Sequence, residues 1–348
     1  MPPSGPPGVR QAAVQAVLDR LVTQGPEIGL QVAAYRNGER VVDAWAGVID
    51  RTSRQPVNGQ TLFSASSTGK GVAATCVHVL AERGQLDYEA PVCAYWPEFA
   101  AHDKHGVTVR QVLSHRAGVP YPPAGFDPTM MVDWQRMCQG IADLPLAFEP
   151  GTRTAYHNYT YGYIVGEIVR RIDGRSIARF LRDEICQPLA IDSLYFGVPR
   201  AELDRVATRE PDSEFNRAEV RQACIPSSGM ITNARSLARH YALLAEGGAL
   251  DGMRLLSEER IRVASELQTD EMDDIYAVRV KRGLGYRLGN DTGPGAGPRA
   301  LGHVGAAMYG YADPDRHLAI AFVKNYIDPA AGWDVAQAVY ASVEQALA

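Results

Sequence analysis

Apolar and polar positions in the first fifty residues predict a helix followed by a β-hairpin. Apolar residues recur at helical spacing over residues 9–22, as they do along one face of an amphipathic helix. Two largely apolar runs, residues 28–35 and 40–48, then flank the pair Asn37-Gly38. This pair favours a tight hairpin turn because both residues tolerate positive φ.

The pattern changes to longer helical segments in the middle of the chain. Residues 71–83 form an almost wholly apolar stretch that predicts a buried helix, and Gly84 follows directly, where a helix C-terminus favours glycine. Further helical patterns cover residues 107–113, 160–172, 176–185 and 234–245. Pro-rich loops interrupt them at residues 120–128 and 144–151. The region from about 60 to 225 is therefore expected to be mostly helical with long loops.

The last third of the chain returns to β character. Residues 284–288, 300–311 and 318–325 are predicted strands, with a turn at Asp313-Pro314-Asp315 and a final amphipathic helix over residues 333–347. Residues 120–133 and 270–282 are expected to be loops. The predicted class is α/β (α+β): an antiparallel sheet flanked by the first and last helices, beside a mostly helical domain. Residues 1–60 and 225–348 would form the sheet domain and residues 61–224 the helical one, with a ligand crevice between them.

Composition narrows the function classes. With 46% hydrophobic and 22% charged residues, the 348-residue chain has the composition of a globular protein. A net charge of −5 argues against a nucleic-acid partner, and no apolar run approaches the length of a membrane span. Residues 1–8 contain neither a basic start nor an apolar stretch. The sequence therefore predicts no secretory signal and a cytoplasmic protein that acts on small molecules.

The five cysteines are odd in number and widely spaced. They are expected to be free thiols rather than a disulfide framework or a metal site. No nucleotide fingerprint or metal-ligand cluster is visible, so no cofactor is expected. The oligomeric state is not predictable from the sequence.

The segment from Phe63 to Gly71 contains Ser67 and Lys70 in an S-x-x-K arrangement. Three residues apart on a helix, the two side chains share a face, so that Lys70 can reach the Ser67 hydroxyl. Serine becomes a nucleophile when a base removes its proton, and lysine is such a base once its pKa is lowered. Taken alone, the motif is weak evidence, because S-x-x-K occurs by chance in many chains and Ser66 could simply cap the helix. A phosphate loop is excluded because Ser64 and Gly71 stand where glycine and Ser/Thr are required.

Two later segments could complete the chemistry. Tyr156 and Asn158 follow the turn at Pro150-Gly151; a tyrosine beside a lysine can relay protons, although packing tyrosines are the commoner case. His303 and Gly305 lie on a predicted strand, where small residues allow close approach of a ligand. His303 would lie at the mouth of the site, although in isolation a strand glycine at a bend with a solvent-facing histidine is the commoner case.

Together the three segments resemble the serine β-lactamase and penicillin-binding-protein superfamily. The resemblance is strongest to its class C-type branch, which includes family VIII carboxylesterases, D-aminopeptidases and acyltransferases. Residues 113–119, 148–151 and 233–238 are also similar to signatures of that superfamily. The resemblance extends from about residue 28 to residue 325.

The resemblance implies acyl transfer through an acyl-enzyme. Ser67 would be the nucleophile, Lys70 and Tyr156 would share the acid–base work, and Asn158 would position Lys70 or the substrate. The backbone N–H groups of Ser67 and Ala306 would form the oxyanion hole, next to Gly305. His115, His157 and His78 are expected to be structural.

The resemblance also has a departure. His303 replaces a lysine that recognises a substrate carboxylate in β-lactamases, so we expect a weaker, pH-dependent anion site and little β-lactamase activity. The sequence favours hydrolysis of a carboxylic ester. The alternatives are a cytoplasmic acyltransferase that uses an amine or alcohol acceptor, with Tyr121, Phe126, Trp134 and Tyr309 as pocket walls, and then a D-aminoacyl amidase or peptidase or a weak β-lactamase.

Overall fold

The computed structural model describes residues 9–327 and 332–348, and its largest element is an antiparallel sheet of eight strands. Those strands are β1 (Gly29–Arg36), β2 (Glu39–Gly47), β8 (Thr269–Met272), β9 (Arg279–Arg282), β10 (Arg287–Leu288), β11 (Leu301–Gly305), β12 (Met308–Asp313) and β13 (Leu318–Lys324). Their order across the sheet is β2-β1-β13-β12-β11-β10-β9-β8. Strand β1, from the first part of the chain, therefore pairs with β13, from the last part. The predicted start at residues 1–8 lies outside the described residues.

Helices and two small sheets complete the fold. The helices are α1 (Val9–Thr23), α2 (Gly69–Glu82), α3 (Val109–Leu113), α4 (Pro128–Val132), α5 (Trp134–Ala142), α6 (Thr160–Asp173), α7 (Ile177–Phe180), α8 (Ala218–Gln222), α9 (Ala234–Ala245), α10 (Glu258–Ala264) and α11 (Asp334–Leu347). The smaller sheets are β3 (Phe63–Ser64), β5 (Met230–Thr232) and β4 (Leu194–Phe196), and the pair β6 (Ala249–Leu250) and β7 (Met253–Arg254). The predicted class, an antiparallel sheet combined with many helices, is confirmed.

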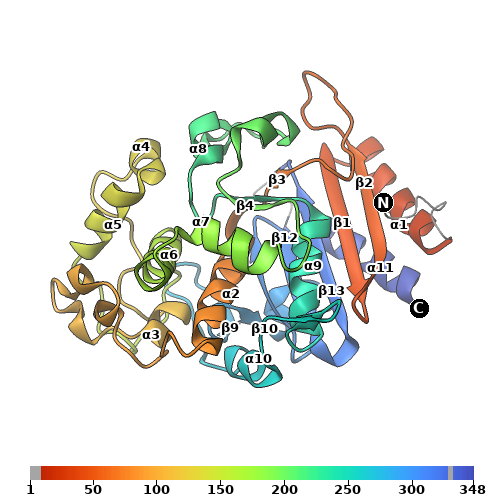
Figure 1. The fold of residues 1–348 in the computed structure, drawn as a ribbon. Helices are drawn as coiled ribbons and strands as arrows, with labels where there is room; N and C mark the ends of the chain where they lie inside the picture. Colours follow the sequence, from red (N-terminus) through yellow and green to blue (C-terminus); the bar gives the residue numbers. More distant parts are fainter. Residues whose placement is uncertain (1–8, 328–331) are drawn as a thin grey trace.

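Two hydrophobic layers hold the large sheet. One side of the sheet packs against α1 and α11, which lie next to each other in Figure 1, and its core includes Val14, Phe322 and Val343. The other side packs against α9, and that core continues through α2 into the helical part of the molecule. Strands β1 and β13 are buried at almost every position, as expected for central strands covered on both faces.

The first hairpin forms where the sequence predicts it. Asn37 and Gly38 have φ of 52° and 75°, so that both take the left-handed conformation that a two-residue hairpin turn requires. The predicted helices over residues 9–22, 71–83, 160–172 and 234–245 are also confirmed within two residues. The helix predicted over 176–185 is α7 followed by a π-helical turn, Leu181–Cys186.

The β character predicted over residues 300–311 is confirmed, but as two strands, β11 and β12, because Ala306 and Ala307 turn the chain with φ of 52° and 59°. Two other predictions for the last third are wrong. Residues 270–282 contain paired strands β8 and β9 rather than a loop alone. The strand predicted over 284–288 is reduced to Arg287–Leu288, since Gly283 and Gly285 hold the preceding residues in a turn. Helices α4, α5, α8 and α10 were not predicted, and α4 lies within residues 120–133, which were expected to be a loop.

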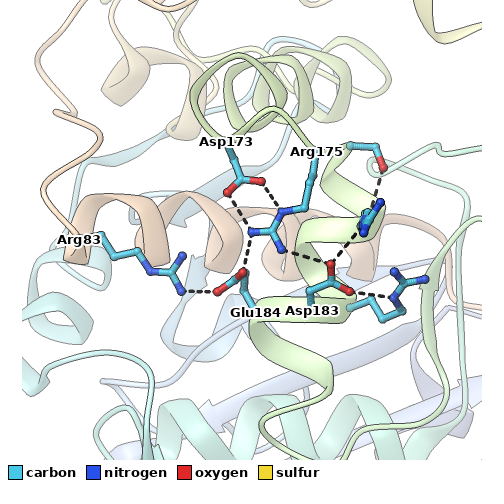
Figure 2. Close-up of polar contacts among 8 residues, drawn as sticks. Arg83, Asp173, Arg175, Asp183 and Glu184 are labelled. Atoms are coloured by element: carbon cyan, nitrogen blue, oxygen red, sulfur yellow. Dashed lines mark hydrogen bonds and ion pairs between the residues drawn. The ribbon is translucent and has the colours of Figure 1, made fainter.

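Ion pairs hold the C-terminal end of α2 in place. Arg83, directly after α2, pairs with Glu184 of the π-helical turn, and Arg175 pairs with Glu184, Asp183 and Asp173 (Figure 2). These side chains are partly exposed, so that each pair adds little stability by itself. Shared partners nevertheless join the C-terminal ends of α2 and α6 to one another, and both helices lead to the site described next.

None of the helices in the described ranges is long and apolar enough to cross a membrane. The proposed division into residues 1–60 with 225–348 and residues 61–224 stays a prediction.

Candidate active site

Ser67 lies in a short 3-10 turn, Ser66–Thr68, that leads directly into α2. The Ala65 N–H donates to the carbonyl of Met230 and the Thr68 hydroxyl donates to the carbonyl of Ala65. Thr68 itself is fully buried. The turn is therefore anchored on both sides of Ser67, while Ser67 stays partly exposed.

Lys70 is placed one turn later and is fully buried. Its Nζ lies 3.3 Å from Ser67 Oγ and donates to the Ser227 carbonyl at 2.9 Å. Burial lowers the pKa of Lys70 well below its usual range, and the charge of Arg287 lowers it further. A neutral amine in this position has a lone pair that can accept the Ser67 proton.

Tyr156 covers the same lysine. The Lys70 Nζ lies 4.6 Å from the centre of the Tyr156 ring, and the tyrosine side chain is buried. Burial raises the pKa of Tyr156, while the charge of Arg287 and a hydrogen bond with Ser67 oppose that rise. Tyr156 therefore keeps its proton at neutral pH and is suited to act as an acid, with Lys70 as the complementary base.

The histidines next to Tyr156 are structural, as the sequence predicted. The His157 N–H donates to His115 Nδ1 at 3.0 Å, and the His115 ring packs 4.7 Å from the Tyr156 ring. His157 Nδ1 donates to the Ala155 carbonyl and its Nε2 accepts from the Val119 N–H. Burial lowers the pKa of His157 to about 4, which agrees with this neutral ring. His78 is likewise a buried core residue, bonded to Tyr88 and to the Leu284 carbonyl.

Asn158 does not contact Lys70 as the sequence suggested. Within residues 9–327 and 332–348, Lys70 Nζ is bonded to Ser67 and Ser227, and Asn158 makes no side-chain hydrogen bond to it. A carbonyl therefore holds the lysine in place of the predicted amide. A role of Asn158 toward the substrate stays a prediction.

The end of β11 lies directly against Ser67. A Cβ added at Gly305 would come within 2.5 Å of the Ser67 backbone nitrogen, so that only glycine allows the strand this close. Ala306 follows in the left-handed turn between β11 and β12. Its N–H and that of Ser67 remain the predicted oxyanion hole.

His303 is placed differently from the prediction. The sequence suggested a histidine at the mouth of the site that would bind anions in a pH-dependent way. Instead His303 is buried, its Nδ1 donates to the Val304 carbonyl, and its ring centre lies 6.2 Å from that of Tyr156. Burial, followed by the charge of Arg287, lowers the pKa of His303 well below its usual range. His303 is therefore neutral at physiological pH and does not supply a titrating cation.

Of the four aromatic residues predicted to wall an acceptor pocket, one lies away from the site. Tyr309 is fully buried on the side of the sheet that faces α1 and α11. Trp134 donates through Nε1 to Glu167, and the Phe126 ring packs 4.6 Å from that of Tyr159. Tyr121 is largely exposed. The prediction is therefore wrong for Tyr309, and for Tyr121, Phe126 and Trp134 it stays a prediction.

Ser227 is the main contributor that the sequence reasoning missed. Besides its carbonyl contact with Lys70, its hydroxyl accepts from the Gly162 N–H at 2.6 Å and donates to the Tyr159 carbonyl at 2.9 Å. It thereby joins the lysine to the start of α6, which follows the Tyr156 segment. The segment 226–229 shows only a cluster of turn-forming residues in the sequence, and that signal gives no function. No group of metal-ligating side chains is found within the described ranges.

Comparisons with known proteins agree with this arrangement. The family model described as "Beta-lactamase" matches residues 15–344. The chain is 32% identical over 340 residues to "Esterase/beta-lactamase LipL" of Mycobacterium tuberculosis, covering 85% of this chain and 77% of that protein. A family VIII carboxylesterase structure superimposes with a TM-score of 0.92 at 31% identity, over 99% of both chains. A penicillin-binding protein homolog from Caulobacter crescentus gives 0.88 at 34% identity, over 97% of this chain and 99% of that one.

Proposed function

The chain belongs to the beta-lactamase family and is a serine hydrolase of its esterase type, and from this premise we propose that Ser67, Lys70 and Tyr156 hydrolyse a carboxylic ester. Ser67 forms the acyl-enzyme, Lys70 is the base and Tyr156 the acid. The β11 end and the Ser67 turn supply backbone donors to the oxyanion.

In the first half of the reaction, Ser67 Oγ attacks the ester carbonyl and transfers its proton to neutral Lys70 Nζ. Tyr156 protonates the departing alkoxide, and the proton on Lys70 restores Tyr156. In the second half, a water molecule replaces the alcohol. Its proton passes to the Lys70–Tyr156 pair, hydroxide oxygen attacks the acyl carbon, and Ser67 recovers its proton as the carboxylic acid leaves.

One observation supports this proposal most directly. Lys70 is wholly buried, makes no ion pair within the described residues, and places Nζ 3.3 Å from Ser67 Oγ. A purely structural lysine would usually be neutralised by a carboxylate when buried so completely. Here its partners are a serine hydroxyl and a carbonyl, which suit a neutral base.

The test is turnover of p-nitrophenyl butyrate by wild type, Ser67→Ala and Ser64→Ala. Ser64 is a matched control because its buried hydroxyl has no hydrogen-bond partner within the described residues. We expect Ser67→Ala to lose both turnover and the butyryl mass increase on the protein, while Ser64→Ala retains both. Turnover that survives in Ser67→Ala would contradict the proposal.

The same assay also tests whether the acyl group passes to water or to another acceptor. An added amine or alcohol acceptor should leave hydrolysis dominant, whereas a new conjugate would support acyl transfer. The sequence also predicts a cytoplasmic location, which cell fractionation would test.

A further inference from the structure

Exposed apolar side chains gather in one short segment, Met272–Val278, which we call the flap. Met272 is 58% exposed, Ile275 37%, Tyr276 49% and Val278 49%. Scattered exposed hydrophobic residues are common on soluble proteins, but a cluster of this kind marks a binding surface. The flap is the connection between β8 and β9 and includes the last residue of β8.

The flap is held in a defined shape at its base. Asp273 is fully buried, and its Oδ1 accepts from the N–H groups of Ile275 and Tyr276 at 2.9 and 3.1 Å. Its Oδ2 accepts from Arg282 Nη2 at 2.6 Å, within a buried ion pair. The carboxylate therefore fixes the turn from below while the apolar side chains above it remain exposed.

A second set of contacts ties the flap to the segment that carries Tyr156. The Asp274 N–H donates to the Thr154 carbonyl at 2.9 Å, and Arg153 pairs with Asp274 at 2.7 Å. The Thr154 hydroxyl also donates to Glu271 at 2.8 Å. The flap and the Tyr156 segment are thus positioned together.

The contact between Tyr276 and Tyr156 shows which part of a substrate the flap would meet. Their ring centres lie 5.0 Å apart, inclined by 48°. In the proposed mechanism Tyr156 protonates the leaving oxygen, so the group attached to that oxygen lies beside Tyr156. The acyl carbon lies instead against Ser67 and β11.

We infer that the flap binds the alcohol portion of the ester and selects apolar alcohols. Ile275 and Tyr276 are the specificity residues, and this inference rests on the proposed function of Tyr156 as the acid. An apolar alcohol would cover side chains that water now contacts, which favours binding. Against the Met272, Ile275 and Val278 side chains, a charged or strongly polar alcohol would lose hydration without gaining a hydrogen-bond partner.

The experiment compares two series of simple esters. One series varies the alcohol at constant acyl group, ethyl against hexyl butyrate, and the other varies the acyl group at constant alcohol, ethyl butyrate against ethyl octanoate. Each is measured as kcat/KM with wild type, Tyr276→Ala, Ile275→Ser and the control Met253→Ser. Met253 is a suitable control because it is 43% exposed but lies on β7, outside the flap.

We expect the hexyl-to-ethyl ratio to fall about tenfold in both flap variants, a loss typical of apolar pocket contacts. The octanoate-to-butyrate ratio should stay within about twofold of wild type, and Met253→Ser should change neither ratio. An unchanged hexyl-to-ethyl ratio in the flap variants would overturn the inference. An equal fall in the hexyl-to-ethyl and octanoate-to-butyrate ratios would also overturn it, because the flap would then contact the acyl group as well.

A binding measurement separates this inference from the proposed function. Titration of hexyl and ethyl butyrate into Ser67→Ala and into the double variant Ser67→Ala/Tyr276→Ala requires no turnover. Preference for the hexyl ester that disappears in the double variant supports the flap as the alcohol site. Equal preference in both proteins overturns it. Absence of ester turnover by wild type would instead contradict the proposed function.

Discussion

The two ends of the large sheet differ in length, burial and regularity. At one end, β1 and β13 pair over seven residues with buried side chains at almost every position. At the other end, β10 has two residues and pairs with β9 at one position, while β8 and β9 carry exposed residues. Strand β11 lies between them and carries His303 and Gly305.

This difference separates catalysis from recognition. The end of the sheet that contains β1 and β13, here called the long end, is stabilised on both faces by hydrophobic packing. It can therefore hold β11 rigidly against Ser67. The end that contains β8, β9 and β10, here called the short end, depends on polar contacts such as Arg282–Asp273 and carries the flap. We infer that changes at the long end alter the chemical step, whereas changes at the short end alter which ester is accepted. Four experiments test the roles of β11, of the short end and of the residues beside Ser67, starting with the largest expected effect.

Substitution of Gly305 by valine should disrupt catalysis most severely. The new Cβ would meet the Ser67 backbone nitrogen at 2.5 Å, so that the nucleophile and a backbone donor must both move. Loss of one oxyanion donor costs about 10² to 10³-fold in other enzymes, and we expect kcat/KM to fall by at least about 10³-fold. Gly106→Val is the control, because nothing lies within 4 Å of a Cβ there. Near-normal ester turnover by Gly305→Val would show that catalysis does not need the close approach of β11 to Ser67.

Asp273→Ala should destabilise the short end of the sheet. It leaves the buried guanidinium of Arg282 without its carboxylate, and breaking such a pair costs about 3 to 5 kcal/mol. Urea unfolding measures the loss, and Asp273→Ala/Arg282→Leu should recover much of it. The exposed pair Glu259–Arg262 provides a control, since Arg262→Ala should hardly move the urea midpoint. Equal effects of the two single variants would argue against a buried, structural pair.

Tyr156→Phe tests the residue whose ring lies near both His303 of β11 and Tyr276 of the flap. Without the hydroxyl, no acid protonates the leaving alkoxide, and we expect kcat/KM to fall by at least about 10²-fold. Tyr163→Phe is the matched control, because Tyr163 is buried and donates to the Met131 carbonyl away from Lys70. If both variants turn over ester alike, the proton relay is assigned to the wrong tyrosine.

The pH dependence gives the smallest effect. Protonated Lys70 cannot accept the Ser67 proton, so that kcat/KM should fall tenfold per pH unit below the pKa of Lys70. Burial is the main cause of its lowered pKa, and the positive charge of Arg287 contributes next. Removing that charge in Arg287→Gln should raise the pKa of Lys70 and move the acid limb to higher pH. Arg279→Gln, which removes an exposed arginine paired with Asp270, should leave the limb unchanged.

The sequence predicted the long end of the sheet better than the short end for a physical reason. Residues 28–48 combine apolar runs with Asn37-Gly38, so that pattern and turn chemistry agree. The β11–β12 turn instead uses Ala306 and Ala307, which carry no turn signal, because tertiary contacts impose their left-handed conformation. Strands β8 and β9 are short and polar, and no period marks them.

The same reason explains which parts of the site the sequence could predict. The spacing of Ser67 and Lys70 predicted their contact, which the structure has at 3.3 Å. The partner of Lys70 is a backbone carbonyl at Ser227, and carbonyls are the same at every residue, so that no sequence pattern could identify it. The burial that neutralises His303 arises from segments far apart in the chain, which a local pattern does not contain.

The pairing of β1 with β13 also bears on how the protein is made. Leu30 lies opposite Lys324, so that β1 completes its hydrogen bonds only after all the residues between these two have been translated. Contacts of such long range slow folding, and a nascent β1–β2 hairpin would expose an unpaired strand edge throughout that interval. Ser67 is synthesised well before Gly305, the residue that fits against it. Activity should therefore appear only after β11 and β13 have been translated, and chaperones that shield strand edges should raise its yield.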